Sequence, residues 1–311
     1  MKSYLVTGGA GFIGSHITHK LLQDHHKVRV LDNFSTGKEE NLDGFTGDLE
    51  IMQGDIRDKE KVRKAVNGID VIFHEAAFVS NPLSFLEPST CLEVNVHGTE
   101  YLLEEARKAG VKRVVMASSA AVYGDTDQVP TSEKTPVQPM SPYAASKAII
   151  EVYARMYTKA YKLEVVALRY FNVFGPKQSP ESDYAAAIPI FIRQILDGKQ
   201  ITIYGDGNQT RDLVYVEDIV QANLLASESS NAPGYVINIC TGIETSILDV
   251  VQSLKEIGNY SQEPKYAPAR KGDIYRSAGD ARLSKDVLDF NPKVSLSEGL
   301  KKTMDWMRQC Q

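Results

Sequence analysis

A tyrosine and a lysine four residues apart, Tyr143 and Lys147, are the two side chains with the clearest chemical use. Ser141 and Pro142 precede them and are typical of the N-cap and first turn of a helix. Residues four apart lie on one helical face. A free tyrosine has a pKa of roughly 10, and a nearby ammonium group would favour its phenolate. The pair therefore predicts a general acid/base for interconverting an alcohol and a ketone.

Three glycines near the N-terminus, Gly8, Gly11 and Gly14, separate an expected strand from an expected helix. Glycines permit a tight turn and let backbone N–H groups approach a pyrophosphate. Asp32 ends the next expected strand, where a carboxylate would hold an adenosine ribose diol and repel a 2′-phosphate. The sequence thus predicts NAD rather than NADP as cofactor. The positive ring of oxidised nicotinamide would also favour the phenolate of Tyr143.

Two further sites have more than one interpretation. Asp55 and Ile56 follow the third expected strand, where they could meet the adenine, or Asp55 could cap its own turn. Ser118 and Ser119 stand where another strand ends, and parallel sheets place ligands at such ends. They could hydrogen-bond a sugar hydroxyl or ketone, or make ordinary turn hydrogen bonds.

Short apolar runs alternate with amphipathic segments in the first half of the chain, which predicts a parallel sheet covered on both faces. The expected strands lie at 4–7, 27–31, 49–53, 71–74, 113–117 and 163–169, and the helices at 13–23, 59–66, 91–109 and 143–160. Further helices or strands are expected at 186–196, 201–204, 216–226 and 235–239, whereas 260–280 reads as irregular.

We expect a Rossmann-type, doubly wound α/β fold with a smaller C-terminal α/β lobe interleaved with it. Residues 1–172 would form the NAD-binding domain, with later returns near 213–243. Residues 173–311 would mainly form the substrate lobe.

Composition limits the partners of the chain. Its 311 residues, 42% of them hydrophobic, can build a large core. The net charge is −5 without a basic run, which argues against nucleic acid or an anionic membrane as partner. Its apolar stretches are too short for a signal peptide or a membrane span. Three isolated cysteines and dispersed histidines indicate a reduced, cytoplasmic protein without a metal site.

Together, these motifs resemble the extended short-chain dehydrogenase/reductase family, and most of all its UDP-hexose 4-epimerases. The resemblance covers nearly the whole chain in order. It rests on the glycine-rich opening at 7–14, His74-Glu-Ala-Ala77, Ser118-Ser119 with Val122-Tyr123-Gly124, Tyr143-x-x-x-Lys147, and the stretches 169–176, 211–218 and 270–273.

The resemblance implies a role for many single residues. Tyr143 would be the acid/base, Lys147 its activator and a ribose ligand, and Ser119 a partner of the sugar O4. Arg211 could instead form a surface ion pair with Asp212. The implied substrate contacts are Ser80, Ser119, Tyr143, Asn172, Ala187, Tyr204, Arg211, Arg270, Asp273 and Ser277. The implied cofactor contacts are Gly8, Gly11, Phe12, Ile13, Gly14, Asp32, Asn33, Asp55, Ile56, Ala76, Ala77, Asn95, Tyr143 and Lys147.

The implied reaction is a redox-neutral C4 epimerisation of a UDP-hexose through a 4-keto sugar. Dehydratases and decarboxylases of the family carry acids directly after the catalytic serine or threonine, where this chain has Ala120 and Ala121. A UDP-glucuronate 4-epimerase, or another NAD-dependent enzyme that modifies nucleotide sugars, remains an alternative. A non-catalytic NAD-binding regulator is disfavoured, because Tyr143, Lys147 and Ser119 are all present.

The resemblance also bears on sugar choice and assembly. Ser277 is small where a tyrosine would restrict the pocket to plain hexoses, and 184–189 resembles UDP-N-acetylglucosamine 4-epimerases, so N-acetylated sugars should fit. Related proteins form homodimers through a four-helix bundle, here at 91–109 and 143–160. The apolar residues available for that interface, or alternatively for the subunit's own core, are Leu92, Val96, Leu102, Leu103, Ile149, Ile150, Val152 and Met156. The implied activity would suit either galactose catabolism or the supply of surface-polysaccharide precursors.

Overall fold

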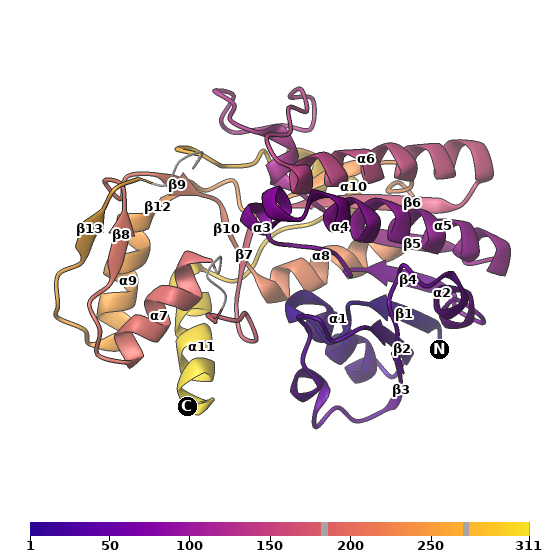
Figure 1. Ribbon diagram of the computed structural model, residues 1–311, viewed down its shortest axis with the longest axis horizontal. Helices are drawn as coiled ribbons and strands as arrows, with labels where there is room; N and C mark the ends of the chain where they lie inside the picture. The colour runs from indigo at the N-terminus through magenta and orange to yellow at the C-terminus, as the bar shows by residue number, and fades with distance from the viewer. Residues whose placement is uncertain (182–185, 270–273, 311) are drawn as a thin grey trace.

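A parallel sheet of seven strands forms the centre of the protein (Figure 1). The computed structural model describes residues 1–181, 186–269 and 274–310. The strand order is β11-β6-β5-β4-β1-β2-β3, which reverses direction at β1 and makes the sheet doubly wound. Its strands are β1 (Ser3–Thr7), β2 (Lys27–Asp32), β3 (Asp48–Gln53), β4 (Val71–His74), β5 (Arg113–Ser119), β6 (Glu164–Tyr170) and β11 (Val236–Ile239).

Helices cover both faces of this sheet (Figure 1). One face packs against α1 (Phe12–Gln23), α8 (Val216–Glu228) and α10 (Arg282–Leu288). The other packs against α2 (Lys59–Ala65), α5 (Gly98–Ala109) and α6 (Pro142–Met156). Two short helices, α3 (Asn81–Leu86) and α4 (Pro88–Leu92), lie beside α6. Because both faces are covered, the strands are apolar without alternation, as their burial shows.

A second, smaller lobe lies on the left of Figure 1. It contains α7 (Ala187–Leu196), α9 (Ile247–Gly258) and α11 (Leu296–Gln309), which share one apolar cluster with Ile192, Leu254 and Met304 at its centre. β8 (Thr202–Tyr204) pairs in parallel with β13 (Lys265–Ala267) at its edge. β7 (Asn172–Phe174) pairs with β10 (Leu213–Tyr215), and β9 (Thr210–Arg211) pairs with β12 (Thr245–Ser246).

The chain crosses between the lobes more than once. After β7 it builds α7 and β8 in the second lobe, and then returns to place α8 on the sheet and β11 beside β6. It leaves again for α9 and comes back with α10. The expected doubly wound α/β fold with an interleaved C-terminal lobe is confirmed.

Three local expectations differ from the structure. The expected helix at 91–109 consists of α4, a π-helical turn η2 (Glu93–His97) and α5, and α6 is likewise followed by a π-helical turn η4 (Tyr157–Tyr161). In the first π turn the Thr99 hydroxyl donates to the carbonyl of Asn95 at 2.6 Å, while the Asn95 side chain bonds outside the helix. The stretch 260–280 is not wholly irregular, because β13 forms there by pairing with β8, its distant partner in the sequence.

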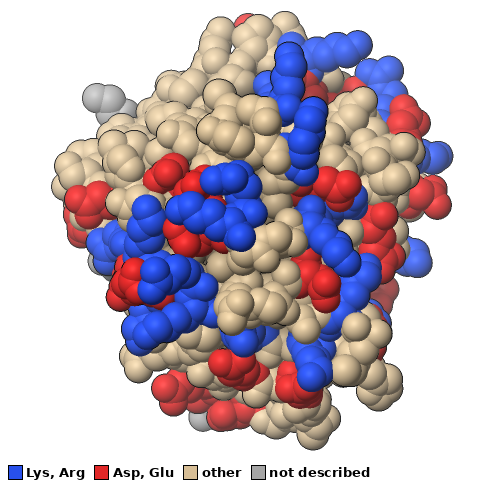
Figure 2. Space-filling view, turned by 90° about the vertical axis from the view of Figure 1, so that its right-hand side faces the viewer, with Lys and Arg blue, Asp and Glu red and all other residues tan. Residues whose placement is uncertain are grey.

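Charges of both signs are intermixed on the face turned toward the viewer in Figure 2. Surface ion pairs of the protein include Arg107 with Glu104 and Lys108 with Glu105. Within the three described ranges, no helix is both long and apolar enough to cross a membrane. Of the 3₁₀ turns in the described residues, η1 (Glu39–Leu42) follows β2 and η3 (Ala120–Tyr123) follows β5.

Candidate active site

The turn between β1 and α1 approaches neighbouring backbone so closely that only glycine fits at two positions. Gly8 has a φ of +68°, and a Cβ there would lie 2.7 Å from the backbone nitrogen of Ala76. A Cβ on Gly14 would lie 2.2 Å from the carbonyl oxygen of Gly8. α1 begins with Phe12 and Ile13 directly after its N-cap glycine, so its first backbone N–H groups face the turn. This cradle suits a pyrophosphate.

Asp32 is the last residue of β2 and is only 7% exposed. Its Oδ2 accepts a hydrogen bond from the backbone of Ala10 at 2.9 Å, and its Oδ1 accepts one from Phe34 at 2.8 Å. A carboxylate oxygen can accept more than one hydrogen bond, so a ribose diol can still be held. The backbone bonds fix the carboxylate beside the glycine turn, which is the arrangement that an NAD site requires.

Asp55 makes the turn-capping bond that was its alternative interpretation. It accepts hydrogen bonds from the backbone, Nε and Nη2 of Arg57, and from Nδ2 of Asn33. The Arg57 guanidinium holds the pKa of the Asp55 carboxyl well below its usual range. Ile56 is buried against Gly98, where a Cβ would lie 2.7 Å from Ile56 Cγ1. A contact of these residues with the adenine stays a prediction.

Asn95 connects the segment after β4 to α6. Ala76 and Ala77 lie in that segment. The Asn95 side chain, 1% exposed, accepts from the backbone of Phe78 at 2.7 Å and donates to Ser146 Oγ at 2.8 Å. The hydrogen bonds of Asn95 are thus to the protein itself, and its contact with a cofactor stays a prediction.

The expected acid/base pair stands at the N-terminus of α6. Ser141 caps the helix by accepting a hydrogen bond from the backbone of Ala144 at 3.1 Å. Tyr143 follows in the first turn, and Lys147 Nζ lies 5.9 Å from the centre of its ring. Lys147 Nζ also donates to the carbonyl of Ala117, near the end of β5, at 2.8 Å. The helix cap and the strand end together place the ammonium group beside the phenol.

In the protein without its cofactor, burial is the main influence on the pKa values of Tyr143 and Lys147. It raises the pKa of Tyr143, while a hydrogen bond with the Ser119 side chain acts in the opposite direction. It lowers the pKa of Lys147 to about 8, against the attraction of the Glu75 carboxylate. The sequence predicted that the Lys147 ammonium and the ring of oxidised nicotinamide together favour the phenolate of Tyr143, and that combined effect stays a prediction. In the protein alone, the cost of removing a phenolate from water is the largest influence on this pKa.

A buried ion pair lies directly below these residues. Glu151, one helical turn after Lys147, receives Nε and Nη2 of Arg169 at 2.7 and 2.6 Å. Ser118 Oγ donates to the same carboxylate at 2.6 Å, so this serine is used inside the protein. The Arg169 guanidinium lies 4.6 Å from the centre of the Tyr123 ring. The ion pair ties α6 to β5 and β6, the strands that end at the site.

A cavity of about 240 Å³ brings together four of the expected substrate residues, namely Ser119, Asn172, Arg211 and Ser277. They come from β5, β7, β9 and the segment that follows residue 273. Their distances in the sequence are large, so this grouping is a product of the fold. A cavity with these polar groups at the carboxyl ends of the strands is suited to a polar ligand.

The alternative interpretation of Arg211 as half of a surface ion pair with Asp212 does not fit the position of that carboxylate. Asp212 is fully buried. It accepts hydrogen bonds from the backbone and hydroxyl of Thr241, both at 2.7 Å, and from the backbone of Gly242 and Gly279. Asp212 therefore joins the segment at Thr241 and Gly242 to the segment at Gly279 inside the protein, while Arg211 lines the cavity.

The polar side chains of this cavity that were not singled out from the sequence include Asn81, Thr126, Thr131 and Arg276. Arg276 is held in a two-pronged ion pair with Glu244, at 3.0 and 2.6 Å. Asn81 is the first residue of α3. No sequence motif includes Asn81 or Thr126. Arg276 could have been proposed from the sequence, because it directly precedes the expected substrate residue Ser277.

Ala120 and Ala121, the first residues of η3, also line the cavity. A methyl group cannot exchange a proton with a substrate. The two positions directly after Ser119 are therefore chemically silent, as the sequence indicated.

Other expected substrate residues lie elsewhere. Ser80 caps α3 and accepts a hydrogen bond from a backbone N–H at 3.2 Å. Ala187 begins α7 and Tyr204 ends β8, and neither belongs to the lining of the 240 Å³ cavity. Arg270 and Asp273 lie outside the described residues.

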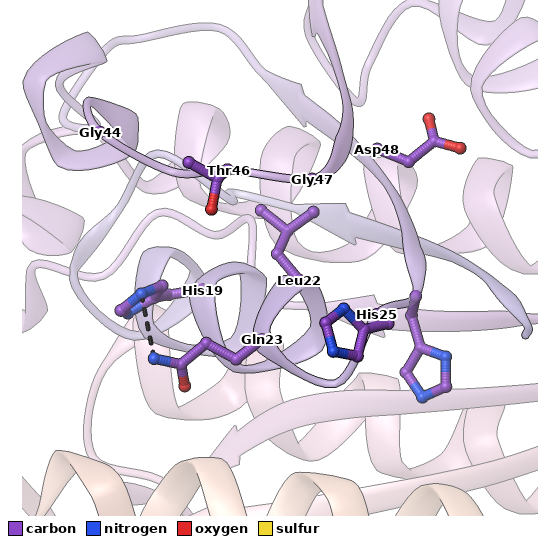
Figure 3. A pocket seen from close by; sticks show the side chains of 9 residues that line it. His19, Leu22, Gln23, His25, Gly44, Thr46, Gly47 and Asp48 are labelled. Carbon is purple, nitrogen blue, oxygen red and sulfur yellow. Dashed lines mark hydrogen bonds between the residues drawn. The ribbon is translucent and has the colours of Figure 1, made fainter.

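A second cavity, of about 330 Å³, is built from other elements (Figure 3). The C-terminal half of α1 and the segment before β3 line it, with His19, Gln23 and His25 among its polar side chains. His19 and Gln23 bond to each other at 3.3 Å. In the described part of the chain, no group of three or more histidines, cysteines or acids is arranged to hold a metal ion. None of the residues assigned above to the cofactor or the sugar lines this cavity.

Comparison with known proteins assigns the family. Residues 4–240 match the model of the NAD dependent epimerase/dehydratase family. The chain belongs to this family. It is 40% identical to the UDP-glucose 4-epimerase of Mycolicibacterium smegmatis, over 98% of each chain.

Solved structures agree over the whole chain. UDP-glucose 4-epimerase from Thermotoga maritima, solved with UDP-glucose, is 40% identical with a TM-score of 0.94 over 99% of each chain. UDP-N-acetylglucosamine 4-epimerase from Methanobrevibacter ruminantium, solved with UDP-N-acetylmuramic acid, is 39% identical with a TM-score of 0.96. That match covers 100% of this chain and 99% of the other. The family uses NAD, which agrees with the cofactor predicted from the glycine turn and Asp32 of this chain.

Asp32→Ala should weaken NAD binding roughly 10- to 100-fold, because a charged hydrogen-bond partner of the ribose is lost. NADP binding should weaken less or improve, since the repulsion of its 2′-phosphate disappears. Titration of each cofactor against the purified protein measures both effects. Asp48→Ala, at the start of β3 and 62% exposed in its side chain, is the matched control and should change neither. An unmodified protein that prefers NADP would contradict the role of Asp32.

Proposed function

We propose that the protein is an NAD-dependent 4-epimerase of UDP-hexoses that works through a 4-keto sugar. Its substrates would be UDP-glucose and UDP-galactose, and also UDP-N-acetylglucosamine and UDP-N-acetylgalactosamine. One observation carries the proposal: Ser119 lines the cavity beside the inert Ala120 and Ala121 and hydrogen-bonds to Tyr143, whose ring centre lies 5.9 Å from Lys147 Nζ. Such a site can move one proton at O4, and those two alanines offer no acid for dehydration.

In this mechanism the protein orients the sugar and holds the proton. Tyr143 takes the proton of the C4 hydroxyl and later returns it, with Ser119 hydrogen-bonded to the same oxygen. Lys147 supplies a positive charge beside the phenol and binds the nicotinamide ribose. NAD, when bound, accepts the C4 hydrogen as hydride and gives it back. Rotation of the 4-keto sugar between the two transfers inverts the carbon.

The two lobes divide the binding. We infer that residues 1–172, with returns near 213–243, hold NAD, and that 173–311 mainly hold the UDP-sugar. Support comes from the glycine cradle and Asp32 on one side, and from Arg211 and Asn172 in the cavity on the other. A guanidinium group is suited to a diphosphate. Arg270 and Asp273 would complete this set.

We further propose a cytoplasmic homodimer built through α4, α5 and α6. The candidate apolar residues divide into two groups, which excludes the alternative that all of them face the subunit's own core. Val96, Leu102, Leu103 and Ile150 are buried, whereas Leu92, Ile149, Val152 and Met156 are 42%, 37%, 62% and 38% exposed. Exposed apolar side chains on helices that pack together are typical of an interface. Cys91, Cys240 and Cys310 are unpaired, as in a reduced compartment.

Tyr143→Phe removes only the ionisable oxygen, so turnover of UDP-galactose should fall by roughly 10²- to 10⁴-fold with little change in folding. NMR of the product mixture measures the conversion. Tyr161→Phe, at the exposed end of the same helical segment, is the control and should keep normal turnover. Near-normal turnover of Tyr143→Phe would exclude Tyr143 as the proton carrier.

Ser277→Tyr should abolish conversion of the N-acetylated pair and spare the plain pair, because the larger side chain fills the cavity beside the sugar. The same NMR assay should include UDP-glucuronic acid, because its conversion would distinguish a UDP-glucuronate 4-epimerase from the proposed UDP-hexose 4-epimerase. Ser277→Ala is the control and should keep both pairs. Equal loss on both pairs, or an unmodified enzyme that ignores N-acetylated sugars, would contradict this role of Ser277. If no UDP-hexose is converted at all, the proposed function is wrong.

Val152→Glu should convert the dimer into a monomer, because it buries a charge without a partner at the interface. Light scattering at micromolar concentration gives the mass. Val137→Glu, at an apolar residue 40% exposed and outside these helices, should leave the dimer intact. A monomeric mass for the unmodified protein would contradict the dimer.

A further inference from the structure

A chain of hydrogen bonds leads from Glu75, the partly buried residue directly after β4, to buried groups on β6 and α8. The Tyr170 hydroxyl donates to Glu75 Oε1 at 2.9 Å. Asn223 Nδ2, on α8, donates to the same hydroxyl at 2.7 Å, and Asn223 also donates to the carbonyl of Ile219 at 2.9 Å. Tyr170 and Asn223 are almost or fully buried. The carboxylate is thus oriented by groups from β6 and α8, and the mechanism above gives it no role.

Glu75 follows His74, which pairs with Met116 in the register of β4 and β5, so Glu75 lies next to Ala117, whose carbonyl accepts Lys147 Nζ. This carboxylate therefore belongs to the neighbour of the lysine's acceptor. Its residue follows β4 beside the glycine turn, and a Cβ on Gly8 would lie 2.9 Å from the Glu75 carbonyl carbon. Its partner Tyr170 lines the sugar cavity and stands next to Ser119 in the register of β5 and β6. Glu75 therefore connects the cofactor turn with the wall of the sugar cavity.

Lys147 has a reason to need a counter-charge. It is 4% exposed, and its ammonium donates to the neutral carbonyl of Ala117. A buried ammonium is costly unless an opposite charge compensates it. Glu151 lies on the same helix, but its carboxylate is already neutralised by Arg169. Glu75 receives its hydrogen bond from a neutral hydroxyl, so that partner leaves its negative charge uncancelled.

We propose that Glu75 is a positioning residue that acts through Lys147, whose ammonium form its carboxylate stabilises inside the site. This inference rests on the proposed function, in which the charge of Lys147 assists Tyr143. In this proposal, the hydrogen bonds from Tyr170 and Asn223 keep the Glu75 carboxylate in a fixed orientation.

The titration of the two groups is consistent with this assignment. Burial raises the pKa of Glu75 to about 7, and the Tyr170 hydrogen bond and the charge of Lys147 oppose the rise. Burial lowers the pKa of Lys147 to about 8, and Glu75 leads the groups that oppose the fall. The other charged or titratable groups that act on either one are Cys91 on α4, Glu151 on α6 and Tyr170 on β6, and His74 on β4 in turn senses Lys147.

The sign of the effect follows from the loss of the carboxylate. In Glu75→Gln the ammonium form of Lys147 loses its attraction, so the lysine gives up its proton at lower pH. The alkaline limb of the kcat profile should move to lower pH by about one unit, which is roughly a tenfold loss of turnover above the limb. Glu75→Leu should shift the limb in the same direction and serves if the glutamine variant folds poorly. Glu75→Asp keeps the charge and should restore most of the original profile.

Glu133→Gln is the matched control. Glu133 is a second partly buried carboxyl with a raised pKa, and it accepts the backbone N–H of Asn238 at 2.8 Å. Its electrostatic partners are Asp280 and Arg169. Its removal should leave the alkaline limb in place. An equal shift in this control would show a general effect of losing a buried carboxyl and would overturn the inference.

A second measurement does not need turnover. Trace acetylation of the purified protein with acetic anhydride, read for the Lys147 peptide by mass spectrometry across pH, reports the titration of the lysine itself. Its midpoint should fall in Glu75→Gln and stay in Glu133→Gln. An unchanged midpoint and an unmoved alkaline limb in Glu75→Gln overturn the inference while the epimerase proposal stands. If the wild type converts no UDP-hexose, the epimerase proposal fails, and the labelling midpoint still decides whether Glu75 acts on Lys147.

Discussion

The ion pair between Glu151 and Arg169 is the constraint on which the geometry of the site depends. Its side chains are 4% and 2% exposed, and it is made by two hydrogen bonds under 3 Å. Breaking a buried pair by removing one partner costs about 3–5 kcal/mol, since the other charge is left uncompensated. Such a pair has one acceptable geometry, so it fixes how α6 lies across β5 and β6.

Position and charge are supplied by different parts of the structure. Ser118, bound to Glu151, fixes the strand end that carries Ser119, and Lys147 stands one turn before Glu151. These contacts place the groups that we propose for proton transfer, but they do not set the charges of those groups. Burial holds the phenol of Tyr143 protonated in the protein alone. In the proposed mechanism the phenolate would therefore form when the oxidised cofactor is bound, because the nicotinamide ring would add a positive charge.

What could be predicted from the sequence was local. The glycine turn, the helix cap at Ser141 and the spacing of Tyr143 and Lys147 are each encoded within a few residues, and their placement follows from turn and helix geometry. The four expected substrate residues that meet in the cavity of about 240 Å³ could be named only through the family resemblance, because the fold alone brings them together.

The features that the sequence did not predict share a cause. β13 exists only because β8 lies beside it, Arg276 is held by Glu244 from another segment, and the pKa of Tyr143 is governed by burial that no spacing reveals. Asp55 shows the reverse case, in which a local capping bond is made and a distant ligand contact has yet to be tested. Desolvation and long-range pairing are properties of the folded chain, so motifs carry little information on them.

The late position of β11 in the chain has a consequence for synthesis. This edge strand covers β6, but α7, β8 and α8 must leave the ribosome before it does. Until residue 239 has emerged, the nascent chain presents β6, an apolar parallel strand, with an open edge. Open edges of this kind recruit other chains. The interleaving that joins the two lobes therefore lengthens the interval in which the growing polypeptide exposes this edge.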